Sequence, residues 1–89
     1  MLFEWDNAKH ERNLRERGFG FDYAVRIFAG LVVERADTRR AYGEVRIQAL
    51  GQTGGDVLLV VYTDRGEVRR IISARYANRK ERELWQSRA

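Results

Sequence analysis

The sequence predicts an α+β domain in which two N-terminal helices precede a four-stranded antiparallel meander sheet and a C-terminal helix follows it. Two observations predict this class. Apolar residues recur at helical spacing near both ends of the chain, whereas the middle alternates or forms short apolar runs separated by glycine turns. Eighty-nine residues without an internal repeat fit one domain, residues 1–89.

The N-terminal third contains signals for two helices. Leu2–Trp5 is a possible extra short edge strand, and Asp6 is a suitable N-cap for a charged helix over Asn7–Arg17 that Gly18 ends. The next helical face has positions i, i+3, i+4 and i+7 occupied by apolar residues, and Gly30 ends it. These positions are Phe21, Ala24, Val25 and Phe28.

Four segments with strand character follow, and short connections favour an antiparallel meander. The predicted strands are Leu31–Arg35, Glu44–Leu50, Val57–Thr63 and Glu67–Ala74. A polar loop, Ala36–Gly43, separates the first two, and Gly51–Asp56 is a predicted turn. On the second strand Glu44, Arg46 and Gln48 share the polar face.

The C-terminal segment begins with a capping box. Asn78 and Glu81 have the spacing at which each side chain accepts a hydrogen bond from the other's backbone N–H. A terminal helix through about Arg88 is therefore predicted. The capping box explains Glu81 without catalysis, as does an ion pair with Arg70 or Arg75.

The charge balance favours an anionic partner. Lys and Arg number 17 against 13 Asp and Glu, so the formal net charge is +4, and only Lys9 and Lys80 are lysines. Arginine suits forked contacts with phosphate, so RNA is the leading candidate partner, although a small basic protein can also bind nothing in particular.

Residue types that are absent or rare exclude several chemistries. The chain has no cysteine and one histidine, which excludes disulfides and thiolate sites and predicts neither a metal site nor a cofactor. The longest apolar run, Val57–Tyr62, is too short to span a bilayer, and no signal peptide is predicted. We expect a cytoplasmic protein without membrane contact.

Arginines interrupt the last predicted strand, and these are the first candidates for catalysis. With regular alternation Arg70 faces one way while Arg69 and Arg75 face the other, so alternation alone does not select a functional face. In RNA cleavage the 2′-hydroxyl attacks the adjacent phosphate, and cations stabilise the charge that develops. Because arginine is a poor proton donor, a second group is needed, for which Glu44 and Tyr62 are candidates.

Further residues are candidates for binding RNA. They are Arg39, Arg40, Tyr42, Arg69, Arg79 and Lys80. For the two on the last helix, a solvated charged face is the simpler interpretation. His10 lies in a charged helix and is interpreted as a surface residue, while Trp5 and Trp85 are interpreted as packing residues.

Two blocks of residues resemble the BrnT family, the toxins of BrnT/BrnA type II toxin–antitoxin systems. The first comprises Phe3-Glu-Trp-Asp6, Lys9, Asn13, Gly18, Phe21, Ala24 and Phe28. The second comprises Glu44, Arg46, Val61-Tyr-Thr63, Arg70-Ile-Ile-Ser-Ala-Arg75, Ala77 and Glu81-Arg82. One departure is Glu16-Arg17-Gly18, where members of the family often have Lys-His-Gly.

The resemblance implies a RelE-like fold and a ribonuclease that halts translation. It also implies a cognate BrnA-like antitoxin that neutralises the toxin and binds DNA, so that the toxin meets DNA only indirectly. Carried over by position, Arg46, Arg70 and Arg75 are the family's basic sheet residues and Glu81 its acidic helix residue.

Three hypotheses remain open from the sequence. The first is a metal-independent endoribonuclease. The second is a non-catalytic basic module that grips an acidic antitoxin segment or a nucleic-acid backbone. The third is a structural use of the arginines, which would tie the terminal helix to the sheet through Glu81 and Glu83.

Overall fold

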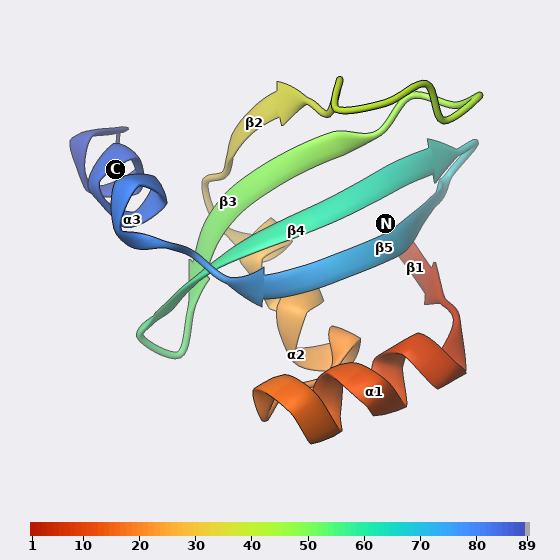
Figure 1. Cartoon of the computed structure of the whole chain (residues 1–89), viewed down its shortest axis with the longest axis horizontal. Coiled ribbons are helices and arrows are strands. Elements are labelled where there is room, and N and C mark those ends of the chain that lie inside the picture. Colours follow the sequence, from red (N-terminus) through yellow and green to blue (C-terminus); the bar gives the residue numbers. More distant parts are fainter. Residues whose placement is uncertain (89) are drawn as a thin grey trace.

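The computed structural model describes residues 1–88 and contains a five-stranded sheet in the order β1-β5-β4-β3-β2 (Figure 1). The strands are β1 Leu2–Trp5, β2 Val33–Ala36, β3 Ile47–Thr53, β4 Asp56–Arg65 and β5 Val68–Tyr76. The helices are α1 Asn7–Arg17, α2 Phe21–Ala24, the 3₁₀ helix η1 Val25–Ala29 and α3 Arg79–Arg88. The predicted α+β class and the helix–sheet–helix order are confirmed.

The sheet is mixed, which corrects the prediction of four antiparallel strands. Strands β2 to β5 do form the predicted antiparallel meander. The possible edge strand Leu2–Trp5 is a fifth strand, and it pairs with β5 in parallel from Leu2↔Val68 to Trp5↔Ile71. This pairing was not predictable from alternation, because it joins the two segments of the sheet that lie farthest apart in the sequence.

The first helix has the predicted boundaries. The second is an α-helix for only its first four residues and continues as a 3₁₀ helix. Asp6 Oδ1 accepts from the backbone N of Ala8 at 2.8 Å, and Gly18 ends α1 with φ 83°. The second segment continues as a 3₁₀ turn after Ala24. There Ile27 packs against Gly51, where a Cβ would lie 2.6 Å from the Cβ of Ile27.

The hairpin between β3 and β4 is tighter than the glycines suggested. The predicted turn was Gly51–Asp56, but both strands continue through most of it and leave a two-residue turn at Gly54 and Gly55, with φ 55° and 84°. These positive values suit the primed turns of two-residue hairpins. At its other end β3 begins at Ile47 and not at the predicted Glu44.

A β-bulge interrupts the pairing of β4 with β5. Val61 pairs with Ser73 and Tyr62 pairs with Ile71, so Ile72 has no partner on β4. A bulge shifts the alternation of side chains by one residue. The regular alternation predicted for β5 is therefore wrong beyond this point.

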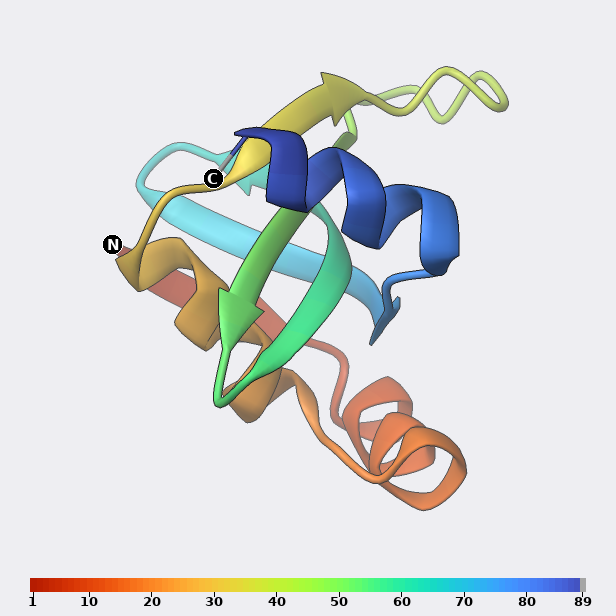
Figure 2. The same cartoon turned by 90° about the vertical axis from the view of Figure 1, so that its left-hand side faces the viewer.

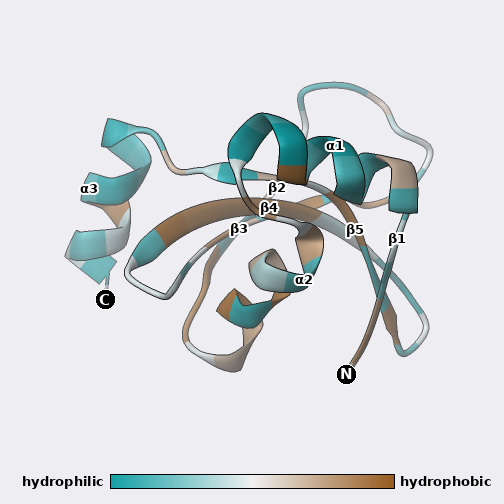
Figure 3. Cartoon of the chain, turned by 90° about the horizontal axis from the view of Figure 1, so that it is seen from below, coloured by the Kyte–Doolittle hydropathy of each residue, from teal (hydrophilic) through white to brown (hydrophobic). Residues whose placement is uncertain are grey.

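Helices cover the two faces of the sheet unequally (Figure 2). One face, called the core face, packs against α2 and η1 in the main hydrophobic cluster, which includes Phe21, Ile27, Val60 and Ile71. The opposite face packs against α3 in a small cluster of Leu50, Leu59, Ala77 and Trp85. Figure 3 shows β4 hydrophobic along its middle, whereas α1 and α3 are mostly hydrophilic. Part of the second face therefore remains open.

No helix within residues 1–88 has both the length and the apolar content needed to cross a membrane.

Candidate functional site

Arginines of β2, β4, β5 and the loop before β3 share the sheet face that α3 only partly covers, and we call it the arginine face. Directly paired residues place their side chains on the same face. Arg75 pairs with Leu59, and Arg70 pairs with Thr63, two positions after Val61. Leu59 packs with α3 and therefore lies on the arginine face, as does Thr63 four positions later on β4. Their partners Arg75 and Arg70 consequently lie on this face too. Without the bulge at Ile72 the two arginines would point to opposite faces, because they are five positions apart.

Arg65 follows Thr63 by two positions on β4 and lies on the same face. Two further arginines come from β2 and from the loop before β3. Arg35 pairs with Gln48, which in turn pairs with Val61 of the arginine face. Arg46 precedes β3, but its carbonyl accepts from the backbone N of Asp37 at 2.8 Å and so extends the β2–β3 ladder by one residue. Arg46 was predicted within a strand, and this correction leaves its face unchanged.

Each of the three predicted catalytic arginines contacts a carboxylate. Arg75 donates to Glu81 at 2.7 and 2.9 Å, Arg70 lies 3.5 Å from Glu4, and Arg46 lies 3.2 Å from Glu44. Their side chains remain 36%, 30% and 25% exposed, respectively. The guanidinium groups are therefore preoriented by acids and still open to solvent.

Glu44 lies among cations at the edge of this face. Its carboxylate accepts from Arg46, and from Arg65 at 3.3 Å. The hydrogen bond from Arg46, with help from Arg65, lowers the pKa of Glu44 below its ordinary value. Glu44 is therefore an ionised carboxylate at neutral pH and can accept a proton. The Arg46 guanidinium also lies 4.0 Å from the centroid of the Tyr42 ring.

Two predicted residues lie on the core face instead. The Tyr62 hydroxyl donates to the carboxylate of Glu34. Burial is the main cause that raises the pKa of Tyr62. The Arg69 guanidinium stacks 3.9 Å from the centroid of Tyr62 and donates to Asp64 at 2.8 Å, with only 14% of its side chain exposed. The structure does not bring Tyr62 or Arg69 to the other candidates, because β4 and β5 place them on the opposite side of the sheet.

The polar loop 37–46 is held together by one buried acid. The Asp37 side chain is 0% exposed and accepts from Arg39 at 2.8 Å through each of its oxygens. Tyr42 donates to the same carboxylate at 3.3 Å, and Arg40 lies 5.8 Å from the centroid of the Tyr42 ring. These bonds, with that of Arg39 the largest cause, lower the pKa of Asp37 to about 2. The loop is thus a preformed basic surface.

Helix α3 carries the remaining candidates. Arg79 and Lys80 are exposed, and Arg79 pairs with Glu83 at 3.3 Å. The predicted capping box is confirmed, because Glu81 N donates to Asn78 at 2.8 Å and Asn78 N donates to Glu81 at 2.9 Å. The same Glu81 binds Arg75, whose hydrogen bonds are the main cause that lowers the pKa of Glu81. Glu81, but not Glu83, ties α3 to the sheet.

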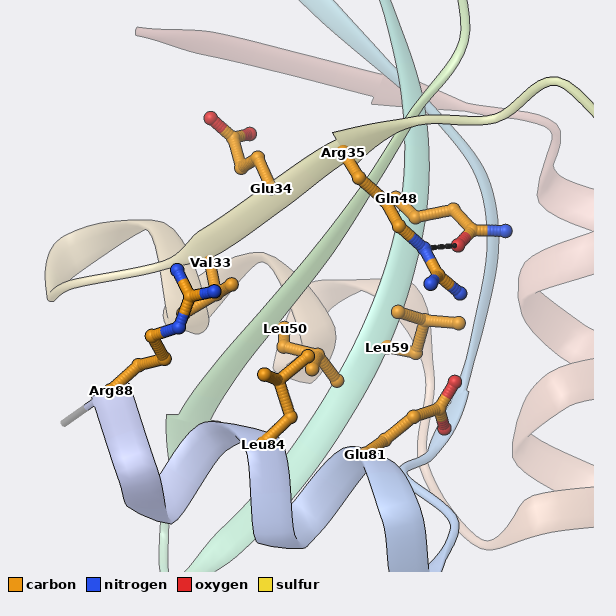
Figure 4. Close-up of a pocket in the computed structure, with 9 residues that line it drawn as sticks. All are labelled: Val33, Glu34, Arg35, Gln48, Leu50, Leu59, Glu81, Leu84 and Arg88. Carbon is orange, nitrogen blue, oxygen red and sulfur yellow. Dashed lines mark hydrogen bonds between the residues drawn. The ribbon is translucent and has the colours of Figure 1, made fainter.

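Arg35 was not predicted to be functional. It lines a pocket of about 190 Å³ between α3 and strands β2 to β4, whose floor is formed by Val33, Leu50, Leu59 and Leu84. Figure 4 shows Arg35 and Arg88 on either side of these apolar side chains, and Arg35 donates to Gln48 at 2.8 Å. The sequence contains no signal for this placement, since the pairing of β2 with β3 decides it.

His10 is a packing residue more than a surface residue, which corrects the prediction for it. Its Nδ1 accepts from the backbone N of Phe21 at 3.0 Å, and its ring stacks with Trp5 at 5.7 Å. It therefore anchors the start of α2. Trp85 is buried as predicted. Within residues 1–88 there is no group of three or more His, Cys, Asp or Glu that could hold a metal ion.

Comparison with protein families gives one match over most of the chain. Residues 5–81 match the family model described as "Ribonuclease toxin, BrnT, of type II toxin-antitoxin system". The matched range begins in β1, ends in the first turn of α3 and includes Arg46, Arg70 and Arg75. No match was found among curated proteins.

Proposed function

The chain belongs to the BrnT family of ribonuclease toxins of type II toxin–antitoxin systems, and from this membership we propose that it is a metal-independent endoribonuclease that cuts RNA on the arginine face. The observation that carries the assignment to this face is the placement of Arg46, Arg70 and Arg75 on one side of the sheet, each partly open to solvent.

The charge of the face suits the transition state of RNA cleavage. The attack of the 2′-hydroxyl on phosphorus gathers negative charge on the phosphate oxygens, and fixed cations stabilise that charge. Guanidinium groups donate paired hydrogen bonds to such oxygens. Because Glu4, Glu44 and Glu81 already hold the three arginines, little reorganisation is needed when RNA binds.

Glu44 is the better placed of the two proton-transfer candidates. It lies beside Arg46 at the arginine face, whereas Tyr62 points to the core face. As an ionised carboxylate, Glu44 can accept the proton of the 2′-hydroxyl. Its lowered pKa makes it a weak base, so we assign most of the rate to charge stabilisation.

The wider biology follows from family membership and is part of the proposal. The fold is RelE-like, cleavage inhibits translation and arrests growth in the cytoplasm, and a BrnA-like antitoxin neutralises the toxin. The toxin meets DNA only through this antitoxin. The basic loop residues Arg39, Arg40 and Tyr42, with Arg79 and Lys80 of α3, extend the surface available to the RNA backbone.

Replacing the arginines tests the site. Expression of Arg46→Gln, Arg70→Gln or Arg75→Gln without antitoxin should relieve growth arrest, and each change should slow cleavage of labelled RNA by about 10²–10³-fold, because one stabilising cation is lost. Arg15→Gln is the matched control, since Arg15 is exposed on α1 and has no ion pair within residues 1–88. Full cleavage by a folded triple variant would remove the assignment.

A non-catalytic binding module is the second candidate. The observation that favours it is that Arg46, Arg70 and Arg75 each already contact a carboxylate, which weakens their attraction for phosphate. Incubation with labelled RNA separates the two functions. Discrete products support catalysis, whereas retention of intact RNA supports the binding module.

A further inference from the structure

Only half of the outer edge of β5 is covered by another strand. β1 pairs with Val68 to Ile71 and then leaves the sheet at Asp6 to begin α1. Within residues 1–88, residues 72–76 have β4 on one side and no strand on the other. Alternate residues of such an edge point their N–H and C=O groups outward. In Figure 1 this uncovered part of β5 faces α1.

A groove of about 330 Å³ lies between this edge and α1. Its strand wall consists of the consecutive residues Ile72 to Arg75. Consecutive side chains of a strand alternate between its two faces, so a groove on one face would be lined by every second residue. Four successive lining residues show instead that the groove runs along the edge of β5. The helix wall is one stripe of α1 at helical spacing, formed by Lys9, Arg12, Asn13, Glu16 and Arg17.

The stripe is basic and its cations are unpaired. Within residues 1–88, Lys9, Arg12 and Arg17 form no ion pair within 4.0 Å, whereas the three catalytic candidates of the arginine face each have one. Glu16 is the one acid that lines the groove. The Tyr76 carbonyl at the end of this edge already accepts from Arg75 Nη1 at 3.2 Å. Three cations without acidic partners beside the remaining outward backbone groups are complementary to a ligand that carries both carboxylates and a polypeptide backbone.

We propose that an extended acidic segment of a protein partner binds in this groove and adds a strand to the free half of β5. The backbone of the segment pairs with residues 72–76, and its carboxylates face Lys9, Arg12 and Arg17. RNA fits less well, because its donors, the 2′-hydroxyls and base N–H groups, do not alternate with acceptors at the spacing of a strand edge, whereas the N–H and C=O groups of a polypeptide do. In the proposed function the partner is the antitoxin, and the inference rests on that function for the partner's identity.

The position of the groove explains how such a segment would neutralise the toxin. Ser73 and Arg75 line the groove and also lie on the arginine face. A bound acidic strand would therefore place carboxylates next to Arg75 and compete with phosphate for the same surface.

Charge reversal on α1 tests the proposal. The variant Lys9→Glu/Arg12→Glu/Arg17→Glu should bind the full-length cognate antitoxin at least about 100-fold more weakly, since acids would then face acids. Arg15→Glu, on another side of the same helix, should change the affinity by less than about threefold. The milder Lys9→Gln/Arg12→Gln variant covers the case in which the triple variant unfolds. Calorimetry measures the affinity, and circular dichroism checks the fold.

Amide exchange supplies an independent readout. In the complex with antitoxin, the outward-pointing amides among residues 72–76 should gain protection, while those of Val33–Ala36 on the opposite edge should not. Unchanged affinity in the folded variants, or protection on β2 instead of β5, would overturn the proposal. Loss of binding to a 2′-O-methyl RNA oligonucleotide without loss of antitoxin binding would assign the groove to RNA and also overturn it. An inactive toxin that still binds antitoxin would contradict only the proposed function.

Discussion

Neighbouring arginines of this chain have different environments, and the difference lies in which face each reaches. Arg69 and Arg70 are adjacent in sequence, yet Arg69 stacks on Tyr62 within the core face while Arg70 lies on the arginine face. Composition predicts that arginines meet anions, but it does not separate a guanidinium that packs on aromatic rings from one that is open to a ligand. At this scale the position in the sheet determines the role.

Asp37 gives a prediction at the residue scale. Arg39 depresses its folded pKa to about 2 from an ordinary value near 3.8, so its stabilising effect is complete above about pH 4 and is lost as the pH falls toward 2. Asp37→Asn should therefore lower the free energy of unfolding at neutral pH. The difference in this free energy between the variant and the unsubstituted chain should shrink toward zero between about pH 4 and pH 2. Urea unfolding over this range measures it.

The control for Asp37 is Glu11→Gln, which removes an exposed carboxylate on α1 that has no ion pair within residues 1–88. If Asp37→Asn lowers the free energy of unfolding by the same amount at pH 2 as at neutral pH, the contact with Arg39 does not depend on the charge of Asp37.

At the scale of elements, patterns local in the sequence were predictable and pairings between distant segments were not. The capping box of α3 and the N-cap Asp6 were correct because each depends on residues at most three positions apart. The bulge at Ile72 and the parallel pairing of β1 depend on where β4 and β5 lie. The sequence therefore named Arg70 and Arg75, but it could not place them on one face or bring Arg35 beside them.

The link between β5 and α3 gives a prediction for an element. A double-mutant cycle with Arg75→Ala and Glu81→Gln should give a coupling energy of about 1 kcal/mol, because the bidentate pair is partly buried, with side chains 36% and 12% exposed. Glutamine at position 81 keeps an oxygen for the capping box, so the cycle isolates the ion pair.

The exposed pair Arg79 and Glu83 on α3 is the control for this cycle. Their side chains are 87% and 63% exposed, so Arg79→Ala and Glu83→Gln should couple by less than about 0.5 kcal/mol. Equal coupling in the two cycles would show that Arg75 does not fix α3 to the sheet. The structural interpretation of Arg75 would then lose its support.

At the scale of the whole molecule, basic residues of this chain with net charge +4 gather on two adjoining surfaces, the arginine face and the groove beside α1. Arg46, Arg70 and Arg75 of the arginine face each contact an acid, while Lys9, Arg12 and Arg17 on one stripe of α1 have no ion pair within residues 1–88. The charge balance predicted an anionic partner but could not predict two adjoining basic surfaces, since the sheet topology places α1 beside the edge of β5. This division suits a protein that meets both RNA and an acidic polypeptide.

Salt dependence tests this division on the intact protein. For single-stranded nucleic acid, the logarithm of the binding constant falls with the logarithm of salt concentration by about 0.7 for each phosphate neutralised. If Arg46, Arg70 and Arg75 each contact one phosphate, their triple Gln variant should show a slope smaller by about 2 than the unsubstituted chain. Fluorescence anisotropy with a 2′-O-methyl RNA oligonucleotide measures binding without cleavage.

The groove variant Lys9→Gln/Arg12→Gln should keep most of the original slope. If the slope of the groove variant instead falls by as much as that of the arginine-face variant, RNA contacts both surfaces, and the assignment of RNA to one surface and the acidic polypeptide to the other is wrong.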